Sequence, residues 1–82
     1  MAVPYTLEDV DHLYDLILPR LEAVRNSGDS SKIHRANQLI ATILGYRNWA
    51  HRAQNVEAVY VLVTYREYIK TAEMWLAEIA GR

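Results

Sequence analysis

The chain has 82 residues, enough for one domain with a single modest hydrophobic core. Apolar residues make up 51% of it, which is well above the composition of disordered chains. There is no cysteine, which excludes disulfides, thiolate metal sites and cysteine nucleophiles. No apolar run approaches the roughly 20 residues that a membrane span needs, and the acidic start does not resemble a signal peptide. We therefore expect a soluble, cytoplasmic protein that does not enter a membrane.

The net charge is only −1, but charge is distributed unevenly along the chain. Residues 1–31 hold six acidic and two basic side chains, whereas residues 32–55 hold four basic side chains and no acidic one. One interpretation is that the acidic first helix neutralises the basic second helix within the fold. The other is that the basic segment is left over to meet a partner.

The first predicted helix spans residues 7–26. Thr6 and Asp9 have the spacing of a capping box, and apolar residues then recur every three or four positions, as in an amphipathic helix. Pro19 lies inside this pattern and lacks a backbone N–H, so we expect a kink or a break there. Gly28 is the expected helix stop, and Asp29 or Ser30 the next N-cap.

Two further helices are predicted at residues 30–44 and 48–80, separated by a turn at Gly45. The third contains a β-branched and aromatic run, VYVLVTY, that could form a strand on propensity alone. A heptad-like apolar repeat passes through that run, however, and favours a helix. The predicted fold is therefore all-α, a single domain built as a small bundle of three helices with a kinked first helix and a long C-terminal helix.

Between Val56 and Tyr65 the third predicted helix is apolar almost all round. Two neighbouring helices leave part of such a helix uncovered, so we expect a homodimer built on it. The alternative is a monomer in which the first helix wraps around the long one. The candidate dimer interface consists of Val59, Tyr60, Val61 and Val63.

The stretch NQLIATILGYRNWAHRAQ, within residues 36–55, resembles part of the helix-turn-helix pattern. Ala41 matches the small residue at the helix crossing, Gly45 the turn glycine and Tyr46 the apolar turn residue. The resemblance covers about 18 residues and implies a DNA-reading helix that starts near residue 47. It would place on that helix the polar side chains of Arg47, Asn48, His51, Arg52 and Asn55.

The sequence contains few of the patterns that are typical of catalytic or metal-binding sites. It has no glycine-rich phosphate loop, no HExxH pattern and no nucleophile elbow. Asp9, His12 and Asp15 share a helix but spread over a wide arc of it, which does not favour a metal site. We therefore expect no enzyme activity, no cofactor and no metal.

The sequence favours a small non-enzymatic protein–protein interaction module, such as an adaptor, an inhibitor or an antitoxin-like protein. The alternative is a helix-turn-helix DNA-binding regulator, although a pI of about 6.3 argues against it. In the first interpretation Trp49 is mostly buried, Tyr46 is half exposed, and the polar side chains around them project outward as one patch. Reversing the charges of Arg47 and Arg52 should then leave stability nearly unchanged. The candidate partner-binding residues are Arg47, Asn48, His51, Arg52, Asn55, Lys32 and Arg35.

Overall fold

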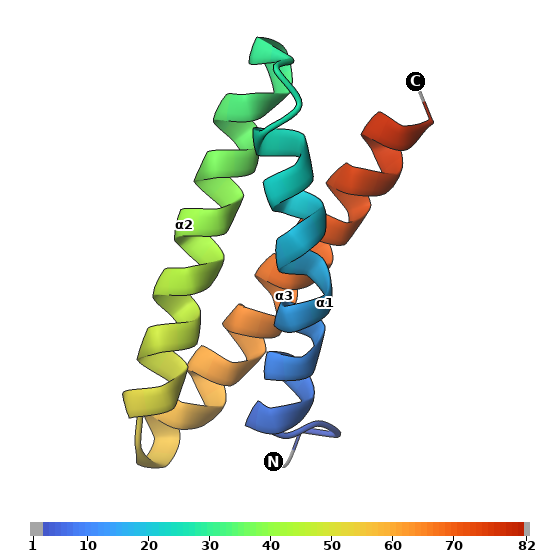
Figure 1. Ribbon diagram of the computed structural model, residues 1–82. Helices are drawn as coiled ribbons and strands as arrows, with labels where there is room; N and C mark the ends of the chain where they lie inside the picture. Colours follow the sequence, from blue (N-terminus) through green and yellow to red (C-terminus); the bar gives the residue numbers. More distant parts are fainter. Residues whose placement is uncertain (1–2, 82) are drawn as a thin grey trace.

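The computed structural model describes residues 3–81, and all regular structure in that range is α-helical. Its three helices are α1 (Leu7–Arg25), α2 (Ser30–Arg52) and α3 (Asn55–Ala80). Helices α1 and α2 run side by side in opposite directions, and α3 crosses behind them at an angle (Figure 1). The predicted all-α bundle of three helices is confirmed, and residues 56–65 are helical.

Helix α1 begins as the sequence predicts. The Thr6 hydroxyl accepts a hydrogen bond from the Asp9 backbone N–H, and the Asp9 carboxylate accepts one from the Thr6 backbone N–H, which completes the capping box. The helix then continues through Pro19 without a break. It ends before Gly28, whose positive φ of 84° suits the residue without a side chain, and Asp29 caps α2.

The boundary between α2 and α3 differs from the prediction. Helix α2 does not stop at Gly45 but continues to Arg52, and the turn consists of Ala53 and Gln54, both in extended conformation. Apolar spacing explains the difference, because Ala50 is buried in the same core as Ile43, and this gain outweighs the roughly 1 kcal/mol that a glycine costs inside a helix. Helix α3 therefore starts at Asn55, several residues later than expected.

The hydrophobic core lies where one stripe from each helix meets the other two. Tyr65 and Ile69 of α3 are fully buried at its centre, and no polar or charged side chain among residues 3–81 is buried with them. The buried residues are Val10, Tyr14, Ile17 and Leu21 of α1, Ala36, Leu39, Ile43 and Ala50 of α2, and Val61, Tyr65, Ile69, Ala72 and Leu76 of α3.

Candidate functional site

A polar cluster joins the three helices around Asp11 of α1. One carboxylate oxygen of Asp11 lies 2.7 Å from Nε2 of His51 on α2. The other accepts a hydrogen bond of 2.8 Å from the hydroxyl of Tyr65 on α3 and lies 3.7 Å from Nε of Arg47 on α2. We call these four residues the Asp11 cluster. A single carboxylate thus holds α1 to both other helices.

The environment of the Asp11 cluster keeps the Tyr65 phenol protonated. Tyr65 is fully buried, and burial, followed by the hydrogen bond to Asp11, raises the pKa of its phenol well above its usual range. The phenol therefore remains a donor to the carboxylate. The Arg47 guanidinium lies over the Tyr14 ring at 5.2 Å from its centroid, a cation–π arrangement that holds the charge close to Asp11.

Of the two members of the predicted outward patch that contact Asp11, His51 is exposed as predicted, whereas Arg47 is only partly exposed. Arg47 and His51 direct their polar atoms at Asp11, and only about a third of the Arg47 side chain is exposed. These contacts match the interpretation in which the acidic first helix neutralises the basic second one. The expectation that charge reversal at Arg47 leaves stability unchanged is not supported, for the same reason.

The other predicted partner residues fall into two separate places. Asn48, Arg52 and Asn55 are exposed around the α2–α3 turn, where Arg52 donates a hydrogen bond of 3.2 Å to the Asn48 carbonyl. Lys32 and Arg35 lie at the opposite end of α2, about 20–30 Å from Asn48 and Arg52 at the rise of an α-helix. Lys32 pairs with Asp29 at 3.3 Å, and Arg35 donates a hydrogen bond to Gln38. The seven residues do not form one surface.

Four aromatic side chains form a second cluster between α2 and α3. Tyr46 stacks on Tyr68 at 5.0 Å and on Trp49 at 5.9 Å, and Trp49 meets Tyr60 edge-on at 6.2 Å. The Trp49 indole N–H donates a hydrogen bond of 2.9 Å to Glu57 on the first turn of α3. Trp49 and Tyr46 are both partly buried, which agrees with the prediction for Trp49, whereas Tyr46 is less exposed than the half exposure that was predicted.

Beside the aromatic cluster, the first turns of α3 expose apolar side chains that the rest of the described chain does not cover. Val56 is 86% exposed, Tyr60 60% and Val59 45%. We call these three residues the α3 apolar face. Their spacing of three and four residues places them together on one side of the helix, about half a turn from Tyr65 in the core.

The structure exposes only some residues of the predicted dimer interface. Val59 and Tyr60 are exposed and Val63 is partly buried, but Val61 has no exposed surface and lies in the core of its own chain. Val61 stands four residues before Tyr65 and therefore shares its inward side. It is removed from the candidate interface, and Val56 takes its place.

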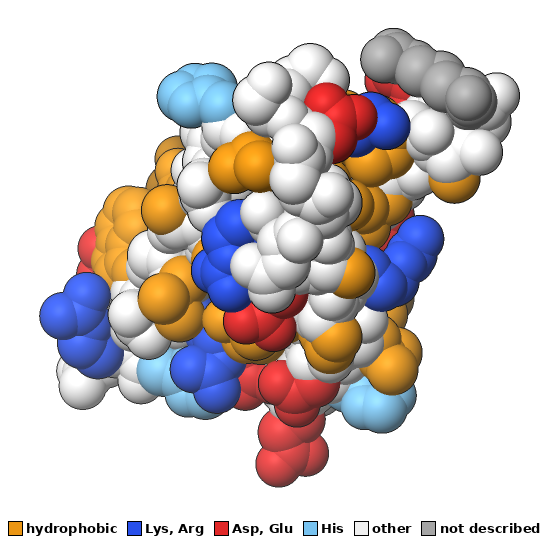
Figure 2. Space-filling view, turned by 45° about the horizontal axis from the view of Figure 1, so that its top comes forward, with side chains coloured by type: hydrophobic (Ala, Val, Ile, Leu, Met, Phe, Trp, Pro, Cys, Tyr) orange, Lys and Arg blue, Asp and Glu red, His pale blue; other side chains and the backbone are white. Residues whose placement is uncertain are grey.

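The structure has no turn at Gly45, where the helix-turn-helix resemblance implies one. Ala41, Gly45 and Arg47 all lie within α2, so no separate reading helix starts near residue 47. On the face that Figure 2 shows, acidic and basic side chains are mixed, with apolar side chains exposed between them. That face does not present the clustered positive charge that is typical of a DNA-binding surface.

Among residues 3–81 no three His, Asp or Glu side chains are grouped so that they could hold a metal ion, and none of the described helices has the length and apolar character to span a membrane. No protein-family model matches this sequence, and neither curated proteins nor solved structures gave a significant match.

Proposed function

We propose that the chain is a small helical protein–protein interaction module that binds its partner through the α3 apolar face. The observation that supports this is the exposure of Val56 and Tyr60, at 86% and 60%, next to each other on one side of α3. Burying such side chains on a partner contributes about 2 kcal/mol each, which is typical of residues that dominate an interface.

The surroundings of the α3 apolar face suit an interface. Trp49 and Tyr60 are aromatic, and aromatic residues are enriched at the centres of protein interfaces. Asn48 and Arg52 are exposed at the nearby turn and provide a polar rim. The module would act as an adaptor, an inhibitor or an antitoxin-like protein, with no chemistry of its own.

A second copy of the chain is the simplest partner. Two copies related by a twofold axis bring the same surface together, so each copy covers the face that the other exposes. Sedimentation from low micromolar to near-millimolar concentration should then show a dimer that dissociates on dilution.

The test uses two variants on the same helix. Val56→Glu places a charge in the proposed contact, whereas Met74→Glu places the same charge at a residue that is 64% exposed and lies several turns away. Both should keep the helix content and melting temperature of the wild type. Only Val56→Glu should abolish the dimer, because burying an unpaired charge is strongly unfavourable. Equal association by the two variants would rule out this face as the interface.

If the wild type is monomeric at every concentration, the same pair of variants tests binding to a different protein. Affinity purification from the native host should then recover a partner with the wild type and Met74→Glu but not with Val56→Glu. A partner retained equally by all three chains would place the binding surface elsewhere.

A further inference from the structure

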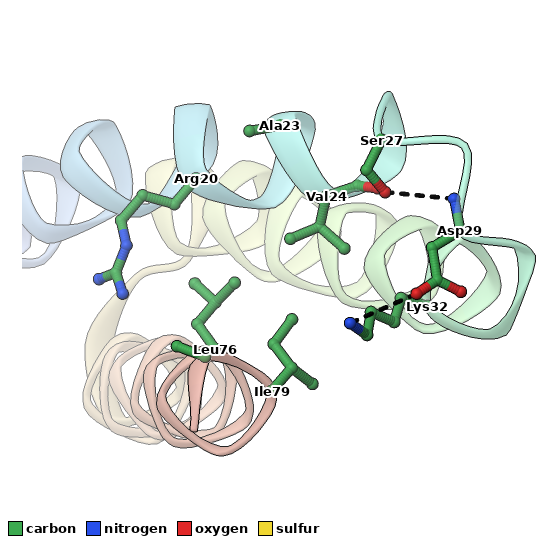
Figure 3. Close-up of a pocket in the computed structure, with 9 residues that line it drawn as sticks. Arg20, Ala23, Val24, Ser27, Asp29, Lys32, Leu76 and Ile79 are labelled. Carbon is green, nitrogen blue, oxygen red and sulfur yellow. Dashed lines mark hydrogen bonds and ion pairs between the residues drawn. The ribbon is translucent and has the colours of Figure 1, made fainter. Parts of the chain in front are cut away.

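The opposite end of the bundle contains an open groove that the proposed function does not use. It lies between the last turns of α1, the start of α2 and the C-terminal turns of α3, where α3 diverges from the other two helices (Figure 1). The volume of the groove is about 530 Å³, within the range of small-molecule sites. Val24, Leu76 and Ile79 are among the residues that line it, and their side chains point toward one another across it (Figure 3).

The charged groups on the two sides of this groove differ in their pairing. On one side Lys32 lies 3.3 Å from Asp29, so that pair is neutral (Figure 3). On the other side Arg20 is exposed, and within residues 3–81 it makes no hydrogen bond, ion pair or ring contact. The groove therefore joins an apolar surface to one cation without a partner among the described residues.

We propose that this groove binds a small amphiphilic anion, with an alkyl chain against Val24, Leu76 and Ile79 and a carboxylate on Arg20. A guanidinium presents a planar fork of donors that matches a carboxylate, and its position fixes the direction of the ligand. The neutral Lys32–Asp29 pair at the other side offers no charge to a second anionic group. A short alkyl carboxylate satisfies both features, whereas a partner helix would extend beyond a groove of this size.

The test is a titration of the full chain with decanoate below its micelle concentration, followed by methyl NMR. The methyl signals of Val24, Leu76 and Ile79 should shift together and saturate at one ligand per chain. Octanoate should bind about two- to four-fold more weakly for each methylene removed, because each buried methylene contributes up to about 0.8 kcal/mol. Decanol, which has the chain without the charge, should bind roughly five-fold more weakly, the upper range for an exposed ion pair.

A substitution of Arg20 distinguishes the contribution of its charge to ligand affinity from that of the apolar surface. Arg20→Gln should bind decanoate only as well as it binds decanol, and its affinity for decanol should equal that of the wild type. Arg35→Gln is the matched control, because Arg35 lies on α2 outside the groove, and it should bind decanoate normally. Unchanged decanoate binding by Arg20→Gln would overturn the proposal, as would equal affinity of the wild type for decanoate and decanol.

Other occupants of the groove give different results. If the same methyl signals shift with protein concentration in the absence of ligand, a second copy fills the groove and the proposal is wrong. If they respond to an acidic helical peptide but not to decanoate, a protein segment is the occupant and the proposal is again wrong. Val56→Glu should bind decanoate as the wild type does, so this test does not depend on the partner surface of α3.

Discussion

Replacing Asp11 by asparagine is the perturbation that best tests the role of the Asp11 cluster. The substitution keeps the size of the side chain and one acceptor oxygen but removes the negative charge. The introduced side chain would still accept the Tyr65 hydrogen bond with its one oxygen, but its amide group would replace the oxygen that faces Nε2 of His51.

The expected cost follows from the three contacts of Asp11. The hydrogen bond from Tyr65 is part-buried and has a charged acceptor, and such bonds contribute about 1.5–3 kcal/mol. The contact with His51 is about two-fifths exposed on the histidine side and adds at most about 1 kcal/mol. Arg47 keeps its charge but loses its carboxylate. Because asparagine retains part of the first contact, we expect Asp11→Asn to lose about 2 kcal/mol of stability.

Thermal and urea unfolding at a fixed protein concentration measure this loss. For a chain of this size, about 2 kcal/mol corresponds to a decrease in melting temperature of roughly 8–16 °C. Asp15→Asn, an exposed carboxylate one turn further along α1, is the control and should change stability by less than about 0.5 kcal/mol. In a cycle with Tyr65→Phe, the two single changes should be non-additive. An Asp11→Asn chain as stable as its control would refute the role of Asp11 in joining the helices.

Three other changes test neighbouring parts of the structure. The free energy of unfolding should fall above about pH 10, by about 1.4 kcal/mol per pH unit. The reason is that Tyr65 ionises near pH 10.0 in the unfolded chain but has a raised pKa in the native one. Tyr65→Phe should flatten this slope in pH-dependent urea titrations. Arg47→Glu should destabilise the folded chain by about 2 kcal/mol, because it places a second carboxylate beside Asp11. Arg52 is exposed, so Arg52→Glu should cost less than about 0.5 kcal/mol. Equal melting temperatures of the two variants would contradict this. Gly45→Ala should stabilise by about 1 kcal/mol, since an added Cβ meets no atom within 4 Å of this helical site; destabilisation would indicate that Gly45 occupies a turn.

The sequence was sufficient to predict the elements whose signals are local. The capping box at Thr6 involves residues three apart, and the glycine at position 28 has the positive φ that its place after a helix suggests. The buried positions of α3 from Tyr65 onward follow the predicted repeat as well. In the first two cases the chemistry that decides the structure lies within a few residues of the chain.

The turn between α2 and α3 was misplaced because two local signals compete there. Gly45 is a conventional helix stop, yet a glycine only lowers helix stability by about 1 kcal/mol, and burial of Ala50 in the core compensates for that cost. The actual turn has weaker signals, since Gln54 is extended without a side-chain cap and Asn55 has a φ of 60°. Asparagine tolerates this left-handed conformation better than most residues. Tertiary packing, which sequence periodicity indicates only in part, decided between the two positions.

The contacts of the Asp11 cluster could not be predicted from the sequence. In the sequence Asp11 is one of six acidic residues within residues 1–31, and its neighbouring residues do not distinguish it from Asp15. Its role depends on the rotation of α2, which turns His51 toward α1, and on the depth at which Tyr65 lies. Both quantities are set by how three helices pack against one another. Part of the basic block predicted as a partner surface is therefore used within the fold.

The α3 apolar face illustrates the opposite case, because an excess of apolar residues is visible in sequence before its location is. A run such as VYVLVTY places side chains all round a helix, and a three-helix bundle covers only part of that circumference. Which side remains open depends on the phase of the helix, and the start of α3 at Asn55 together with the burial of Tyr65 sets that phase. Val61 is then directed inward, and Val56 and Tyr60 are left outside. The excess of apolar residues follows from composition, whereas the identity of the exposed ones follows from packing.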